Sequence, residues 1–495
     1  MKKVLLAAVA GVMAFAGVAA DALAQAKDSV VIVMRLEPAP GLDPTMGAAA
    51  AIGEVTSYNV FENLVRMDQT GKIHPMLAEK WAISEDGLSY VFDLVKGVKF
   101  HDGTDFDSAD VKYTFERNVG EKSTNKDKAL FANIVAIETP DKHKVVVKLK
   151  SPNSLFLFKL AQAPSSIANE EAVANIGTAP GGTGPYKFVK WTKGDSVEIE
   201  KFAGHRDAAK IKIAKVKFRF ISDEAAQVAA LLAGDVDYIT NVSPESVDQL
   251  RKNPTLQVTV GTTEGETILT MNNKHPALSD VRVRRAIMHA IDRKAVIDGA
   301  QAGFGTPIGA PFAPHHPAYI DLTGMSAYDP AKAKALLKEA GQEGKLELSL
   351  KLPPPSYARK GGEIIAAMLG EVGIKTKIEN VEFAQWLDAV FRKKQYDLTI
   401  ISHVEPMDII NYTNPEYYWQ YDSQAFRDLY KQFEQATTEA DQNKLLQAMQ
   451  RKLAEDAVNG YLFEFAKLGA AKKGLKGLWS NQPAFINHVA QMAWE

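Results

Sequence analysis

Acidic and aromatic side chains gather in one polar segment of the chain, residues 405–421. Its acids include Glu405 and Asp408, and its rings include Tyr412, Tyr417, Tyr418 and Trp419. Aromatic rings stack on sugars, aliphatic amines and peptide side chains, and a carboxylate beside them can hold a cation. The segment therefore predicts a binding site for a small solute, with Glu405 as its charged partner. The alternative is that several of the rings pack the interior of the domain.

Catalytic signatures are missing from the sequence. It contains no H-E-x-x-H, no G-x-S-x-G and no Walker motif. Ser123 and Lys126 have the spacing S-x-x-K, but they lie among charged residues, where the lysine stays protonated and cannot act as a base. We therefore expect no enzyme activity, no catalytic residue and no cofactor.

Histidines raise the question of a metal site. His315 and His316 are adjacent, so their side chains point apart on most backbones, and no H-x-x-x-H spacing brings a second histidine to either of them. His403 stands apart from both. The sequence predicts that the protein binds no metal directly.

The N-terminus has the pattern of a secretory signal peptide. Met1-Lys2-Lys3 precedes an uncharged run over residues 4–20, and A-x-A exits follow at Ala22–Ala24 and Ala24–Ala26. An uncleaved membrane anchor is the alternative reading. The chain has 0 Cys, so no lipidated cysteine can tether it. We expect a freely diffusing protein in the periplasm, with cleavage after Ala24 or Ala26.

The charges of the chain nearly balance. Lys and Arg number 58 and Asp and Glu 60, a formal net charge of -2. No strong electric field is expected, so nucleic acids and anionic membranes are poor candidates for partners.

The C-terminal half alternates between strands and helices. We expect strands over residues 345–352, 374–378 and 397–401, with helices over 363–372 and 382–391 between them. An earlier helix should begin at Asp329 and Pro330. This alternation predicts a mostly parallel sheet, with ligands beyond the carboxyl ends of its strands. Trp386, on the second of these helices, is a further candidate for ligand contact.

Residues 71–117 should form a scaffold. Tyr90, Phe92 and Leu94 lie on one face of a predicted strand, and a second short strand should follow over 98–101. Ser108 is expected to cap the next helix.

Several motifs resemble those of one family. They are HPMLAEKW at 74–81, GVKFHDGT at 97–104, SADV at 108–111, GTGPYKF at 182–188 and MNNKHPALSDVRVRRAIMHAIDR at 271–293. In this order they resemble the peptide/nickel family (family 5, cluster C) of periplasmic substrate-binding proteins of ABC importers. The resemblance implies an α/β fold of the type II periplasmic-binding-protein class, with two lobes (a Venus flytrap) and an extra inserted domain.

The resemblance also implies how the chain is divided. After a signal peptide at 1–24, domain I would combine residues 25–64, 183–270 and 470–495. Domain II, the insertion, would span 65–182, and domain III would span 271–469. A solute would be enclosed between the lobes by a hinge motion.

For function, the resemblance implies a receptor that captures a small solute, preferably a di- or oligopeptide, and delivers it to a membrane permease and its ATPase. The receptor would be a monomer. A non-peptide solute (an opine, polyamine, glycoside or nickel complex) and a role as an exported chaperone or chemoreceptor partner are the alternatives.

The resemblance also points to site residues. In peptide-binding members, an aspartate in the loop after the strand equivalent to 397–401 pairs with the peptide's α-ammonium. Here that position falls on or beside Ser402 and His403, so Glu405 and Asp408 would have to take over the charge from shifted positions. Position in the family fold adds Asn241, Asn273 and Phe312.

Overall fold

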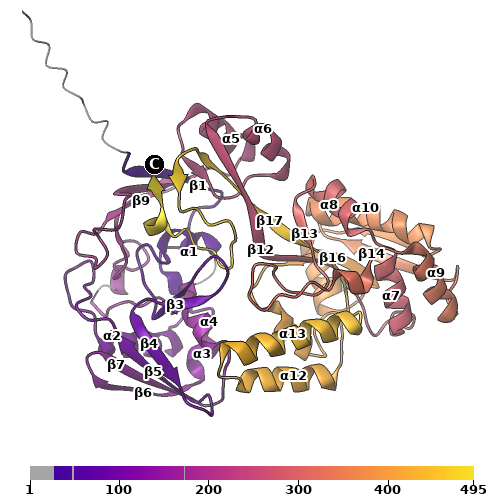
Figure 1. Cartoon of the computed structure of the whole chain (residues 1–495), viewed down its shortest axis with the longest axis horizontal. Helices are drawn as coiled ribbons and strands as arrows, with labels where there is room; N and C mark the ends of the chain where they lie inside the picture. The colour runs from indigo at the N-terminus through magenta and orange to yellow at the C-terminus, as the bar shows by residue number, and fades with distance from the viewer. Residues whose placement is uncertain (1–26, 47–48, 172) are drawn as a thin grey trace, which may run out of the picture.

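The computed structural model describes residues 27–46, 49–171 and 173–495. The predicted signal peptide, residues 1–24, lies outside the described residues. Within the described ranges, no helix is both long enough and apolar enough to span a membrane. The chain forms two lobes that are joined by long strands (Figure 1).

A mixed sheet of 11 strands runs through both lobes, in the order β15-β14-β16-β12-β17-β11-β1-β10-β9-β8, with β13 beside β17. In the first lobe the strands are β1 (Ser29–Met34), β8 (Tyr186–Thr192), β9 (Ser196–Lys201), β10 (Lys215–Phe220) and β11 (Tyr238–Ile239). Helices α1 (Ala50–Thr56), α5 (Glu224–Ala233) and α6 (Val247–Arg251) complete the first lobe, together with the C-terminal pair β18 (Leu475–Lys476) and β19 (Ala493–Trp494).

Two long antiparallel strands, β12 (Leu256–Met271) and β17 (Gly460–Lys472), connect the lobes (Figure 1). Their pairing begins at Leu256 and Lys472 beside the first lobe and ends at Leu269 and Gly460 inside the second. The register shifts between Thr262 and Glu266. Such an irregularity bends a strand locally, and here it falls where the strands leave the first lobe.

The second lobe has a three-strand parallel edge that is covered by helices. β14 (Glu347–Leu352) pairs in parallel with β15 (Lys375–Asn380) and with β16 (Leu398–His403), which confirms the predicted arrangement. The helices are α7 (Val281–His289), α8 (Arg293–Gln301), α9 (Pro330–Glu339), α10 (Ser356–Glu371) and α11 (Phe383–Trp386); α11 continues as a π-helix, Leu387–Arg392. β13 (Gly305–Pro307) follows α8. Asp329 caps α9 as predicted, because its carboxylate accepts the Lys332 N–H at 2.9 Å.

A separate four-stranded sheet, in the order β4-β5-β7-β6, forms a module beside the first lobe (Figure 1). This β4–β7 module contains β4 (Ala78–Ile83), β5 (Ser89–Leu94), β6 (Ile134–Asp141), β7 (Lys144–Leu149), α2 (Ser108–Val119), α3 (Lys128–Ala132) and α4 (Phe156–Leu160); β2 (Val65–Met67) and β3 (Ile73–Pro75) lead into it. Tyr90, Phe92 and Leu94 are buried on one face of β5, which confirms the predicted scaffold strand.

Two predicted details of this module are wrong. Residues 98–101 form no strand, and Lys99 makes only an isolated bridge with Asp105. The helix cap is Asp107 rather than Ser108: the Asp107 carboxylate accepts the Ala109 N–H at 2.8 Å. A carboxylate also suits the positive end of the helix dipole, whereas the Ser108 hydroxyl donates to the Asp141 carbonyl at 2.8 Å.

Helices α12 (Gln424–Gln435) and α13 (Glu439–Glu455) pack against each other beneath the sheet and reach toward the β4–β7 module (Figure 1). The Ser154 hydroxyl, in the module, donates to the carbonyls of Phe433 and Ala436 at the end of α12. The helix pair therefore contacts the module on the side away from β12 and β17.

Candidate solute-binding cleft

A cleft of about 540 Å³ lies between the two lobes. The first lobe lines it with Arg35, Glu54 and residues 240–245, and the second lobe with Gln301 and Ser356. The bend of β12 and the facing part of β17 form the side where the lobes are joined. A volume of this size suits a small solute, since such sites usually measure about 300–1,000 Å³.

The segment that follows β16 borders this cleft. Val404 and Pro406 line the cleft, and Glu405 lines two smaller cavities that adjoin it. The side chain of Glu405 is exposed, so this acid is accessible from the cleft. Glu405 thus lies in a loop that borders the cleft, and its contact with a solute stays a prediction.

Ser402, His403 and Asp408 form a compact network at the same place. The Ser402 N–H donates to the Tyr357 hydroxyl at 3.0 Å. His403 Nδ1 lies 2.5 Å from Asp408 Oδ2, and its Nε2 lies 2.8 Å from the Tyr418 hydroxyl. The imidazole is thus fixed between two partners, and it fixes the loop that carries Glu405.

The predicted aromatic residues mostly lie in the core of the second lobe. Tyr412 and Trp419 stack with their ring centroids 4.1 Å apart, and both rings, like that of Tyr418, are buried. Trp386 is buried too, and its indole N–H donates to Thr399 Oγ1 at 2.9 Å. Tyr417 is partly buried against Trp419. In the described residues none of these five rings lines the cleft, and they position the 402–408 loop from behind.

The three residues expected from the family fold have different surroundings. Asn241 is exposed and lines the cleft. Phe312 lines a small cavity beside the cleft and meets the His316 ring edge-on, with centroids 4.8 Å apart. Asn273 instead donates its amide to the carbonyls of Met271, Trp419 and Val458, so it ties the backbone together.

Five carboxylates surround that small cavity, and we call them the acid pocket: Glu264, Glu266, Glu405, Asp408 and Glu464. Glu266 on β12 is paired directly across the sheet with Glu464 on β17 and with His403 on β16. Directly opposed residues on one sheet have Cβ atoms about 5 Å apart, so like charges there repel each other. Glu405 and Asp408 are among the site residues predicted from the sequence, whereas Glu264, Glu266 and Glu464 on the crossing strands are not.

The acid pocket holds its carboxyl groups in an unusual environment. Burial, together with the charges of Asp408, Glu264 and Glu405, raises the pKa of Glu266 well above its ordinary 4.5. Burial and the charges of Glu266 and Glu264 raise the pKa of Glu464 in the same direction. Both groups therefore resist ionisation unless a positive charge approaches them.

A histidine connects the acid pocket to β12. His315 Nε2 lies 2.8 Å from Glu264 Oε1, and its Nδ1 lies 2.7 Å from Thr262 Oγ1. The side chains of the described chain form no group of three or more His, Cys, Asp or Glu with the arrangement of a metal site. The pocket is therefore better described by its charge than by metal coordination.

One signal in the sequence could have revealed the missed acids. Glu464 interrupts the apolar run Tyr461–Phe465, and Glu266 lies in the run of buried residues, 265–271, that ends β12. A lone acid inside a central strand is costly to bury without a partner, which makes it a candidate for function.

Comparison with known proteins agrees with this geometry. The glutathione-binding protein GsiB of Escherichia coli is 31% identical over 349 residues, which cover 70% of this chain and 68% of that protein. The unliganded open form of the periplasmic murein tripeptide binding protein MppA superposes with a TM-score of 0.85 at 22% identity, covering 94% of this chain and 97% of that one. The likeness confirms the predicted two-lobe fold.

The binding protein AgaA of A. tumefaciens, in complex with agropinic acid, superposes with a TM-score of 0.72 at 27% identity, covering 94% of this chain and 99% of that one. The model of the bacterial extracellular solute-binding proteins, family 5, matches residues 72–426. The chain therefore belongs to family 5 of the bacterial extracellular solute-binding proteins, the substrate-binding proteins of ABC importers.

Proposed function

We propose that this protein captures a small solute in the interlobe cleft and delivers it to the permease and ATPase of an ABC importer at the inner membrane. The observation that carries the proposal is the cleft itself: about 540 Å³ lined by both lobes. A solute held there contacts both lobes at once, so it stabilises whichever arrangement brings them together. We further propose that the protein is exported to the periplasm through residues 1–24 and acts as a monomer.

The proposed division into domains supports a hinge mechanism. Domain I is residues 25–64, 183–270 and 470–495, domain II is 65–182 and domain III is 271–469. Separate hydrophobic cores lie in each part, around Phe218, Phe92 and Leu350. The bend between Thr262 and Glu266 is the proposed hinge, because few backbone hydrogen bonds have to change there.

For the solute we propose a peptide or a related amino-acid derivative. The related proteins include a glutathione-binding protein, a murein tripeptide binding protein and a protein in complex with agropinic acid, and two of these three ligands are peptides. Glu405, Asp408, Asn241 and Phe312 are the proposed contacts among the predicted residues. Ser402 and His403 hold the loop that carries the two acids, and no chemical step is required of any of them.

The test combines binding with a measurement of shape. The secreted form of the chain is titrated by calorimetry with glutathione, agropinic acid, dipeptides, polyamines and nickel. Small-angle scattering is then recorded with and without each compound that binds. We expect saturable binding without any product, and a smaller radius of gyration for the complex. Scattering curves that coincide at saturation would contradict closure of the lobes.

A further inference from the structure

Glu464 is an ionisable residue that has no hydrogen-bond partner among the described residues. Its side chain is 0% exposed, and neither carboxylate oxygen has a hydrogen-bond partner among the described residues. Leaving such a group unpaired costs free energy, and natural structures retain it mainly where a function requires it. Because Glu464 lines the small cavity, the missing partner has a place to bind.

The surroundings of Glu464 are short of positive charge. Among the described residues that line the acid pocket, none is Lys or Arg. Burial, with a contribution from His315, lowers the pKa of His316 to about 4, so His316 is neutral at neutral pH. Five carboxylates thus face one cavity. His315 and His403 lie beside Glu264 and Asp408, but no Lys or Arg lies in the described lining.

The small cavity measures about 10 Å³, which is room for one water-sized group. It shares Glu264 and Pro406 with the large cleft, so a group that enters it can remain joined to a solute in the cleft. An ammonium group, or one end of a guanidinium, has the appropriate size and charge.

The wider cleft has the same sign of charge. Around the three adjoining cavities, the described lining includes eight acids and two basic residues: Glu54, Glu224, Glu245, Glu264, Glu266, Glu405, Asp408 and Glu464 against Arg35 and Lys126. Arg35 is already paired with Glu224 at 2.9 Å. Electrostatic focusing in such a cleft favours the approach of cations.

We propose that the acid pocket binds a protonated nitrogen group of the transported solute, an ammonium or a guanidinium, between Glu266 and Glu464. This inference rests on the proposed function, and it narrows the solute to a cation at that end. The source of the nitrogen is a peptide α-ammonium, a basic side chain or a polyamine.

Matched probes distinguish these sources. Alanyl-arginine is compared by calorimetry with alanyl-citrulline, in which the guanidinium is replaced by a neutral group of similar shape. N-acetyl-alanyl-arginine removes the α-ammonium, spermidine presents amines without a peptide, and N-acetyl-glutathione, which has no protonated nitrogen, serves as the anionic probe. We expect at least one cationic probe to bind, and the partner that lacks the recognised charge to bind about 30-fold more weakly or worse.

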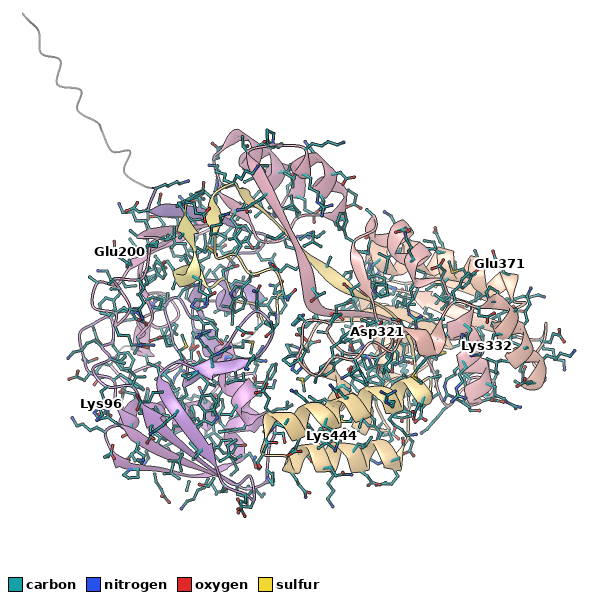
Figure 2. All side chains as sticks on the ribbon, in the orientation of Figure 1. Lys96, Glu200, Asp321, Lys332, Glu371 and Lys444 are labelled. Carbon is teal, nitrogen blue, oxygen red and sulfur yellow. The ribbon has the colours of Figure 1, made fainter. Side chains whose placement is uncertain are left out.

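Two variants connect the charge preference to the pocket. Glu464→Gln should weaken the binding of the preferred cationic probe about 30-fold, because it removes the unpartnered carboxylate while keeping its shape. Glu405→Gln changes an exposed acid of the same pocket and should weaken binding less. Glu371→Gln, at the end of α10 on the outer edge of the second lobe, is the matched control and should leave binding unchanged (Figure 2). Thermal melts check that each variant is folded.

The outcomes separate the inference from the function. If N-acetyl-glutathione binds as tightly as every cationic probe, or if a folded Glu464→Gln variant binds all the cationic probes unchanged, the inference is overturned while the proposed function as a solute receptor remains. Binding of nickel alone at the pocket would also overturn it. If no probe binds, both the proposed function and the inference are contradicted.

Discussion

Glu62 in the first lobe and Glu464 on β17 are both removed from solvent, with exposed fractions of 2% and 0%. Arg206 holds Glu62 from two sides, with Nη1 2.8 Å from Oε2 and Nη2 2.5 Å from Oε1. Burial alone would raise the pKa of Glu62, but the neighbouring His205 and Arg206 bring it down to about 2. The pKa of Glu464 instead remains well above its ordinary value, because burial raises it and the neighbouring Glu266 and Glu264 raise it further.

The difference indicates what each carboxylate is for. Where a buried acid supports the fold, the chain supplies the cation itself, because an unpaired buried charge costs several kcal/mol. Where the described residues supply no cation, the buried acid destabilises the fold. The binding of a cationic ligand then explains why the acid is there. Glu62 therefore belongs to the framework, and Glu464 belongs to the solute site.

Removing the cation from the framework pair should have the largest effect. Arg206→Met leaves Glu62 buried without its guanidinium, so we expect the free energy of unfolding to fall by about 3 kcal/mol at neutral pH. A carboxyl with a lowered pKa stabilises the fold above its ordinary pKa of 4.5 and loses that contribution as the pH falls toward 2. The loss of unfolding free energy in the variant should therefore be smaller at acidic pH. Urea unfolding at several pH values measures this loss.

An exposed pair provides the control for this change. Arg427 lies 2.7 Å from Asp422, whose side chain is 62% exposed. Arg427→Met should cost less than about 1 kcal/mol, because solvent already screens the pair. Equal losses in the two variants would remove the contrast on which the assignment of Glu62 rests.

The corresponding change at the solute site should have the opposite sign. Glu464→Gln removes a carboxyl that has no partner, so we expect the unliganded protein to gain on the order of 1 kcal/mol at neutral pH. A raised pKa means that the contribution of Glu464 is fully present below pH 4.5 and is lost as the pH rises through the raised value. The difference in unfolding free energy between the variant and the parent protein should therefore grow from about pH 4 to about pH 7, in favour of the variant.

Several other ionisable groups lie around Glu464, and their own titration contributes to the pH dependence of stability. They are Glu264 and Glu266 on β12, Glu405 and Asp408 after β16, and His315, His316 and Tyr319 before α9. Glu266→Gln should shift the same curve, since its charge is one cause of the raised pKa of Glu464. A Glu464→Gln variant that is less stable than the parent protein at neutral pH would show that the carboxyl supports the fold.

Much of the framework could be predicted from the sequence. The faces of β5, the cap at Asp329 and the parallel edge of the second lobe follow from local periodicity and turn residues, which act within a few positions of the chain. The cap at Asp107 was missed because two capping residues stand next to each other, and only the contact of Ser108 with Asp141 decides between them.

The solute site was less predictable because long-range pairing assembles it. Glu266 and Glu464 are far apart in the chain and become neighbours only through the register of β12 and β17. The aromatic residues show the opposite case. Tyr412 and Trp419 lie in a polar segment and were predicted to contact the solute, yet they stack on each other in the core. Local polarity did not reveal which side of the loop faces the cleft.

The smallest effect is expected at Glu405, the exposed acid of the pocket, and it can be compared directly with the effect at the buried Glu464. Glu405→Gln should weaken the binding of alanyl-arginine or spermidine, whichever of them binds, by about 3- to 10-fold. A solvated charge contributes less to binding than a buried one. Its stability should stay within about 0.5 kcal/mol of the parent protein, because Glu405 is exposed. Calorimetry and thermal melts of the same samples measure both quantities. A binding loss at Glu405 as large as that at Glu464 would mean that depth in the pocket does not determine how strongly a carboxylate holds the solute.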